Sequence, residues 1–178
     1  MKELVHRSRS QAMRKRKDFI DLPEAYEKYY KFLYFLVKNF NPIHILELGV
    51  YKGISLHHMC LAAHPATKIV GVDIDLTQIH PRTNLGDVRL VNSDSIKYLA
   101  TLPTGSMDAA IVHLDTVHEF EHVRVELAEV ERVCCSPSIV CIDDIDISSD
   151  MSRWWGSLQR KKVYMPELHV TGYGCVLI

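Results

Sequence analysis

The sequence predicts an α/β fold: a seven-stranded, mostly parallel sheet with helices on both faces and an antiparallel hairpin at the carboxyl end. Two observations predict it. Short apolar runs rich in β-branched residues alternate with stretches of helical periodicity, which is typical of parallel strands joined by crossover helices. Most of these runs also end in a glycine or an acid. Parallel sheets bind ligands at that edge, beyond the carboxyl ends of their strands.

Length and composition favour one ordinary globular domain. The 178 residues are 47% apolar and 24% charged, with a formal net charge of -1, which argues against a disordered or fibrous chain. No run approaches the roughly 20 apolar residues of a membrane span. The basic amino terminus has no apolar stretch behind it that would make a secretory signal. We therefore expect a cytoplasmic protein with no membrane partner.

The cysteines favour free thiols over a zinc site. None of the five has a Cys-x-x-Cys partner, and most lie in apolar runs. They are Cys60, Cys134, Cys135, Cys141 and Cys175.

A basic arm, residues 1–20, precedes a single domain, residues 21–178. Residues 1–17 hold seven Lys or Arg against one acid, Glu3, a net charge of +6, so the remainder carries -7. Such an arm can tether nucleic acid, attract an anionic substrate or dock on its own domain. The last is favoured, because the arm lacks interleaved aromatic residues that stack on bases. Nucleic acid is therefore an unfavoured partner.

The first helix is predicted from Asp21, which caps it, with Pro23 in the first turn and Glu24 at the capping-box position. Apolar residues at three- and four-residue steps carry it to about Asn39. Further helices are expected over 55–63, from Ser95 to about Leu102, after the capping box at Thr116 to Val133, and over 149–160. The expected strands are 43–48, 68–73, 88–91, 107–114, 139–142, 163–171 and 173–178, the last two meeting at Gly172.

Polar or glycine clusters stand at the ends of the first five strands. Any one carboxylate could simply cap a helix, but five clusters on one edge favour a ligand cleft. The clusters are Glu47 to Gly53, Asp73, Asp94 with Ser95, Asp115, and Asp143 with Asp144.

Three of these clusters resemble those of class I S-adenosylmethionine-dependent methyltransferases, which have a Rossmann-like fold. The matching stretches are Glu47-Leu-Gly49-x-x-x-Gly53, Gly71-Val-Asp73 and Asn92-Ser-Asp94-Ser95. The Gly-x-Gly-x-x-Gly of a nicotinamide site is missing from the first turn. The resemblance implies that Asp73 accepts hydrogen bonds from the ribose hydroxyls and that Asp94 and Ser95 lie by the adenine. It implies that the methionine part is approached by the loop that contains Glu47, Gly49, Tyr51, Lys52, Gly53 and Ser55.

A narrower resemblance is to the divalent-metal O-methyltransferases, more closely to the cephalosporin-hydroxylase-like and sugar or macrolide types than to the catechol type. It is carried by Leu114-Asp115-x-x-His118 and by Val-Cys-Ile-Asp143-Asp144. Catechol enzymes have lysine in place of His118 and asparagine in place of Asp144. The implied cofactor half covers about 43–105, and the acceptor and metal half about 106–178.

The metal expectation also has a physical basis. The fourth and fifth strands should be neighbours about 4.8 Å apart, which would bring Asp115 beside Asp143 and Asp144. Three hard oxygen ligands suit Mg²⁺ or a similar divalent metal. Asp115 and His118 are the candidate catalytic residues, with His118 as a general base or, equally, an ordinary residue of the first helical turn. His113 is left out, because strand alternation does not place it clearly on the site.

We therefore expect an enzyme that transfers a methyl group from S-adenosylmethionine to a hydroxyl of a small polyhydroxylated molecule, assisted by a divalent metal. Two alternatives remain. One is a metal-free methyltransferase acting on nucleic acid recruited by the basic arm, and the other is a non-catalytic cofactor-binding protein. The sequence leaves open whether the chain forms a homo-oligomer.

Overall fold

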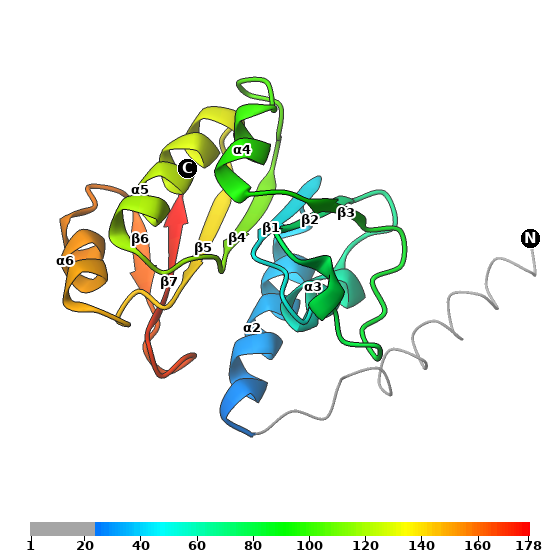
Figure 1. The fold of residues 1–178 in the computed structure, drawn as a ribbon, viewed down its shortest axis with the longest axis horizontal. Helices are drawn as coiled ribbons and strands as arrows, with labels where there is room; N and C mark the ends of the chain where they lie inside the picture. Colours follow the sequence, from blue (N-terminus) through cyan, green and yellow to red (C-terminus); the bar gives the residue numbers. More distant parts are fainter. Residues whose placement is uncertain (1–23) are drawn as a thin grey trace, which may run out of the picture.

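The computed structural model describes residues 24–178, in which a seven-stranded sheet has the order β3-β2-β1-β4-β5-β7-β6. The arm at residues 1–20 and the predicted cap at Asp21 lie outside the described residues. Strands β1 to β5 pair in parallel, β7 is antiparallel to both β5 and β6, and β1 lies between β2 and β4. This is the predicted Rossmann-like arrangement (Figure 1).

The strands are short and close to their predicted places. They are β1 (His44–Leu48), β2 (Lys68–Asp73), β3 (Arg89–Asn92), β4 (Ala110–Leu114), β5 (Ile139–Asp143), β6 (Lys162–Tyr164) and β7 (Tyr173–Leu177). The fourth strand was predicted to begin at Met107, which instead makes an isolated bridge to Cys134.

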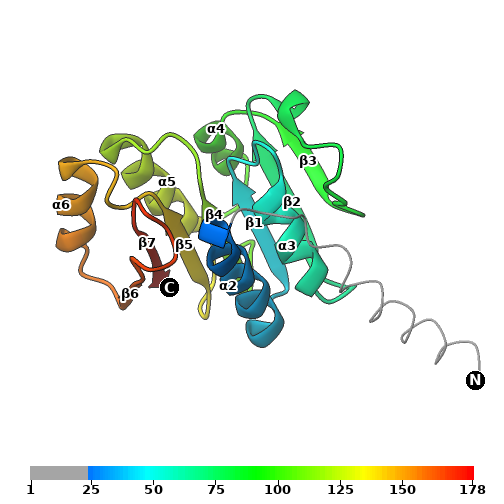
Figure 2. The same ribbon diagram turned by 90° about the horizontal axis from the view of Figure 1, so that it is seen from below.

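Helices cover both faces of the sheet, α2 and α3 on one and α4 and α5 on the other (Figure 2). The described helices are α2 (Glu24–Phe40), α3 (Ile54–Ala62), α4 (Ser95–Ala100), α5 (Phe120–Val133) and α6 (Ser149–Ser157), with a 3-10 turn η1 (Leu76–Gln78). Between β2 and β3 the chain carries only this short turn. The last helix stops three residues before its predicted end.

Strand alternation divides the core into two layers. Leu46 of β1 and Val112 of β4 pack under α4, α5 and α6, whereas their neighbours Ile45 and Ile111 pack under α2 and α3. In a parallel sheet both faces are buried, so these strands read as nearly continuous apolar runs. The parallel register, with Leu48 beside Leu114, brings the ends of β1 and β4 to one edge.

The expectation that residues 163–171 form a strand is wrong. Strand β6 ends at Tyr164, and residues 165–172 form a loop before β7. Pro166 has no N–H to give to a ladder, and Gly172 has φ +80°, which ends the extended run. Because β7 runs antiparallel to β5, with Tyr173 opposite Asp143, this loop returns to the carboxyl edge of the sheet.

Both tryptophans and most of the cysteines belong to the packed core. Trp154 and Trp155 are both buried against the α5 side of the core. The cysteines are free, and Cys134, Cys141 and Cys175 are buried as predicted, whereas Cys60 and Cys135 are only partly covered. Between residues 24 and 178, no helix has the length and apolarity needed to cross a membrane.

Candidate functional site

The loop that follows β1, residues 47–55, is called here the cofactor loop. It needs glycine at two positions. Gly49 has φ +87°, and a Cβ there would lie 1.8 Å from the backbone oxygen of Asp115. Gly53 has φ +72° and is the N-cap residue of α3. Glycine therefore lets the loop pass directly against the end of β4, with the free N–H groups of α3 at its far end.

Glu47 lies beneath this loop. Its carboxylate is fully buried and accepts hydrogen bonds from the Ser55 hydroxyl and, at 2.9 Å, from Nδ1 of His113. Burial raises the pKa of Glu47, and the hydrogen bonds oppose that change. Burial lowers the pKa of His113, but the hydrogen bond and charge of Glu47 outweigh it and raise it to about 9. The pair thus retains a proton at neutral pH and supports the loop from below.

Asp73, at the end of β2, holds the other side of the loop. Its Oδ2 accepts from the Tyr51 N–H at 2.7 Å, and its Oδ1 accepts from the Asp75 N–H at 2.8 Å. Each carboxylate oxygen has a second lone pair. Asp73 can therefore fix the loop and still accept hydrogen bonds from a vicinal diol.

Two hollows open at this edge, and Asp115 lines both. The first hollow has a volume of about 370 Å³, and the second of about 280 Å³. The first is lined by Tyr26, Tyr30, Val50, Tyr51, Lys52, Gly53, Ile54, Ser55 and Asp115. The second is lined by Gly49, Val72, Asp73, Ile74, Ser93, Asp94, Ser95, Asp115, Thr116, Val117 and His122.

Two predicted residues of the second hollow are also tied to the fold. Asp94 is the N-cap residue of α4, where its Oδ1 accepts from the Lys97 N–H at 2.9 Å. The Ser95 hydroxyl lies 3.3 Å from Nε2 of His122. Polar residues from the ends of β2 and β3 and the start of α4 thus line this hollow together with the apolar Val117.

A second group of polar side chains lies beside Asp115. We call it the carboxylate–imidazole cluster. It consists of Asp115, His118, Asp143, Asp144 and His169. His118 bridges two carboxylates, with Nδ1 2.7 Å from Asp144 Oδ2 and Nε2 3.4 Å from Asp115 Oδ1. His169 Nδ1 lies 2.8 Å from Asp143 Oδ1 and 3.2 Å from Asp144 Oδ1.

Opposite charges within the cluster partly offset one another. Burial lowers the pKa of His118, but its contacts with the carboxylates of Asp115 and Asp144 outweigh that effect and raise the pKa to about 10. Hydrogen bonds to Asp143 and Asp144 likewise raise the pKa of His169 to about 10. Burial would raise the pKa of Asp144, yet hydrogen bonds from both histidines and Thr171 hold it well below its usual range. Two imidazolium ions therefore stand among three carboxyl groups at neutral pH.

The structure groups the predicted metal residues differently. Asp143, Asp144 and His169 each place one ligand atom within 4.8 Å of the others. Asp115 joins them through His118. His169 was missing from the predicted set, because residues 163–171 were read as a strand. The available signal was the antiparallel pairing of the last strand with β5, which returns the preceding residues to the site edge.

His113 was also missed. Its ring is fully buried on β4 and connects Glu47 of the cofactor loop to the hydroxyl of Tyr29, 2.8 Å from Nε2. Alternation along β4 places His113 on the α2 side of the sheet, below the site. Glu47, its paired residue on β1, lies on the same side. A buried histidine beside a buried acid on the neighbouring strand could have been found by aligning the two strands.

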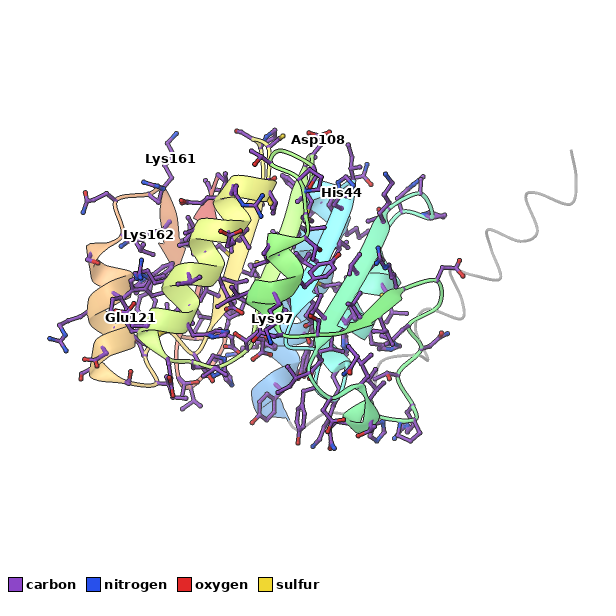
Figure 3. All side chains as sticks on the ribbon, turned by 45° about the horizontal axis from the view of Figure 1, so that its top comes forward. His44, Lys97, Asp108, Glu121, Lys161 and Lys162 are labelled. Carbon is purple, nitrogen blue, oxygen red and sulfur yellow. The ribbon has the colours of Figure 1, made fainter. Side chains whose placement is uncertain are left out.

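The edge opposite the site has a different character. His44 and Asp108, labelled in Figure 3, lie at the amino ends of β1 and β4, where His44 Nδ1 is 3.0 Å from the Asp108 carbonyl oxygen. That contact joins a side chain to the backbone of an adjoining turn. The predicted site residues, in contrast, gather at the carboxyl ends of the strands.

Comparisons with known proteins agree with this arrangement. A methyltransferase domain family model matches residues 46–145, more than half of the chain, and an O-methyltransferase family model matches residues 2–85. No curated protein sequence gives a significant match.

Three solved structures are similar in fold. A methyltransferase from Geobacter sulfurreducens is 17% identical, with a TM-score of 0.69 over 97% of this chain and 88% of that chain. The O-methyltransferase from Bacillus cereus in complex with S-adenosylhomocysteine is 16% identical, with a TM-score of 0.61 over 100% and 91%. The O-methyltransferase from Streptomyces achromogenes involved in tomaymycin synthesis, in complex with S-adenosylmethionine, is 15% identical, with a TM-score of 0.58 over 89% and 91%.

Residues 47–55, Asp73 and Asp115 lie within the methyltransferase domain match, whereas Tyr26 and Tyr30 of the first hollow lie within the O-methyltransferase match. The family models agree with the predicted resemblance in both halves of the chain. The chain belongs to the methyltransferase domain family and is a class I S-adenosylmethionine-dependent methyltransferase, and its residues 2–85 match an O-methyltransferase family.

Proposed function

We propose that the protein transfers the methyl group of S-adenosylmethionine to a hydroxyl of a small polyhydroxylated acceptor, at the carboxylate–imidazole cluster and with a divalent metal. One observation carries the proposal. Asp115 lines both hollows and is linked through His118 to Asp144. A cofactor that fills both hollows would therefore have its central sulfonium beside a group of oxygen ligands.

The lining residues support one orientation of the cofactor. The nucleoside would lie in the second hollow, where Asp73 can accept from the ribose hydroxyls and Val117 offers an apolar surface for the adenine. The methionine part would lie in the first hollow, beside Lys52, Ser55 and the helix start after Gly53. A carboxylate is favoured near a helix amino terminus and a lysine.

The cluster fits a divalent metal by its donor set. Asp143, Asp144 and His169 would hold it, with ligand atoms within 4.8 Å of one another. Oxygen ligands suit Mg²⁺ and Ca²⁺, and an added imidazole also suits Mn²⁺. When bound, such an ion would polarise an acceptor hydroxyl and lower its pKa.

The chain's own residues would orient the acceptor and receive its proton. Asp115 can accept a hydrogen bond from the attacking hydroxyl beside the sulfonium. His118 can act as the general base only after it has lost its own extra proton, since contacts with Asp115 and Asp144 raise its pKa to about 10. Its predicted role as a base therefore requires that Asp115 or Asp144 bind another cation in place of His118, which would lower the pKa of the histidine.

The first hollow, which would take the methionine part of the cofactor, also has aromatic side chains against which an acceptor would pack. Tyr26 and Tyr30 of α2 and Tyr51 of the cofactor loop line the first hollow. Tyrosine offers both a ring face and a hydroxyl, which suits a small ring that carries several hydroxyl groups. The O-methyltransferase match from residue 2 supports an arm that belongs to this domain.

A labelled-methyl assay tests the proposal. The full chain is incubated with methyl-labelled S-adenosylmethionine and a panel of catechols, sugars and glycosides, in Mg²⁺, in Mn²⁺ and in EDTA. We expect O-methylation that EDTA abolishes and that Asp143→Ala lowers by about 100-fold or more. Asp150→Ala is the matched control, because that exposed carboxylate on α6 pairs with Arg153 away from the cluster.

Metal binding is measured separately by calorimetric titration of Mn²⁺. Turnover that is indifferent to EDTA, or Mn²⁺ binding that is the same in Asp143→Ala and the wild type, would contradict the metal part. Methyl transfer to RNA or DNA alone would contradict the acceptor class.

A further inference from the structure

A chain of buried polar groups runs from the cofactor loop to the carboxylate–imidazole cluster. It begins at Ser55, whose side chain lines the first hollow and donates to Glu47. Glu47 Oε1 lies 2.9 Å from Nδ1 of His113, and Nε2 of His113 lies 2.8 Å from the hydroxyl of Tyr29. These residues come from α3, β1, β4 and α2.

Tyr29 extends the chain to the cluster. Its hydroxyl donates to Oδ2 of Asp143 at 3.5 Å, and Oδ1 of Asp143 lies 2.8 Å from Nδ1 of His169. If Tyr29 donates its only proton to Asp143, it must accept from His113. His113, with hydrogens on both ring nitrogens, then donates to Glu47 on one side and to Tyr29 on the other.

Burial restricts the hydrogen-bond partners that these side chains can choose. Glu47 and His113 are each 0% exposed, and Tyr29 is 3% exposed. Polar groups in such surroundings have no water to replace a lost partner, so each strongly favours the arrangement that keeps its hydrogen bond, and among these atoms Glu47 Oε2 alone lacks one. A shift of the Ser55 end therefore changes the partners available to Tyr29, and through them the orientation of Asp143.

We propose that His113 and Tyr29 are positioning residues that connect the cofactor loop to Asp143. A ligand that binds in the first hollow would then change the environment of the His169 imidazole through this hydrogen-bonded chain. Neither residue belongs to the site predicted from the sequence. The proposal requires cofactor binding but neither the metal nor the acceptor. It can therefore be tested independently of the acceptor class and the metal in the proposed function.

A second route between the two ends must be separated from this one. Tyr26, which lines the first hollow, has its ring centroid 6.0 Å from that of His169. A ligand that moves this ring could disturb His169 without any hydrogen-bonded chain. The test must therefore remove a hydroxyl and leave the rings in place.

The experiment follows the imidazole resonances of nitrogen-15-histidine-labelled protein during titration with S-adenosylhomocysteine in EDTA. His169→Gln assigns the His169 signals. In the wild type we expect the His169 signals to shift as the ligand binds. In Tyr29→Phe, which keeps the ring, we expect the ligand still to bind and most of that shift to be lost.

Tyr173→Phe is the matched control. The Tyr173 ring packs edge-on against that of Tyr29, with centroids 5.1 Å apart, and is equally buried, but its hydroxyl has no hydrogen-bond partner among the described residues. We expect the His169 response to survive this change. His113→Asn breaks the same link from the other side, because the asparagine amide can still donate to Glu47 but does not reach Tyr29, and it replaces Tyr29→Phe if that variant does not fold.

Three outcomes would overturn the proposal. They are an unmoved His169 in the ligand-bound wild type, an undiminished shift in Tyr29→Phe or His113→Asn, and an equal loss in Tyr173→Phe. An undiminished shift would assign the connection to other contacts of the first hollow, either the rings of Tyr26 and Tyr30 or the link from Asp115 through His118 and Asp144.

Discussion

The cofactor loop and the carboxylate–imidazole cluster lie against each other at Asp115, yet they are built in different ways. The loop is a continuous segment whose shape depends on backbone conformation, with Gly49 and Gly53 at positive φ. The cluster brings together side chains from the ends of β4 and β5 and from the loop before β7, held by contacts such as those of His118 and His169. A local turn tolerates few residue types, whereas an assembled cluster depends on every strand that positions it.

The largest expected effect is at Gly49. Gly49→Ala puts a Cβ 1.8 Å from a backbone oxygen of β4 and keeps an unfavourable φ of +87°. We expect a loss of roughly 3 kcal/mol or more in the free energy of unfolding, together with loss of cofactor binding. Urea denaturation and calorimetric titration with S-adenosylhomocysteine measure the two.

Gly86→Ala is the control for that change. Gly86 also has positive φ, +57°, but nothing lies within 4 Å of a Cβ built there. It should cost only about 1–2 kcal/mol, the penalty of the left-handed conformation alone. Equal effects at the two glycines would show that backbone conformation, and not the contact with β4, limits the loop.

The next effect is on pH dependence. The pKa of His113 in the folded protein, about 9, lies above its ordinary value of 6.5. The folded state therefore binds this proton more tightly, and the resulting stability is complete below pH 6.5 and lost as pH rises through 9. In EDTA the free energy of unfolding should fall across that interval, with a contribution from His113 of up to about 3 kcal/mol.

Denaturation at a series of pH values checks the sign and separates the regions. His113→Asn should flatten the decrease between pH 6.5 and 9. His118→Gln and His169→Gln should each reduce the decrease from pH 6.5 up to pH 10, because the pKa values of these histidines are also raised above 6.5, and only their effect extends beyond pH 9. Stability that is constant or rises over the first interval would contradict the protonated His113–Glu47 pair.

A smaller effect is expected at His169. His169→Ala should weaken Mn²⁺ binding by about tenfold or more, if the imidazole is a ligand and not only a partner of Asp143. Calorimetric titration of Mn²⁺ measures it, with His64→Ala, an exposed histidine beyond α3, as the control. Unchanged affinity would assign the metal to the carboxylates alone.

The smallest effect concerns Asp94, a helix cap that also lines the second hollow. Asp94→Ala should cost about 1 kcal/mol of stability, and Asp94→Ser should restore most of it, because serine also accepts from the free N–H groups of a helix start. Urea denaturation measures both variants. If Asp94→Ser restores stability but not affinity for S-adenosylhomocysteine, Asp94 also contacts the adenine.

Local features of this site could be predicted from the sequence. A glycine at positive φ, an acid at the end of an apolar run and a cap before a helix each depend on a few neighbouring residues. Gly49, Asp73 and Asp94 accordingly stand at the edge where they were expected. The resemblance to methyltransferases rests on the same local stretches, and the family models match them.

Contacts between segments that are distant in the sequence could not be predicted from neighbouring residues. Residues 163–171 look like a strand, and only the pairing of β7 with β5 shows that His169 returns to the cluster. His113 was set aside on alternation alone, although it lies beside Glu47 across the sheet.

The sequence by itself determined the alternation of strands and helices, the cofactor loop and the acids that end β2, β4 and β5. Only the tertiary structure decided which of these acids share an imidazole and which buried histidine joins the two halves. The physical reason is that backbone conformation and helix capping act between near neighbours in the chain. Hydrogen bonds among buried side chains such as Tyr29, His113 and Asp143 depend instead on strand order and register.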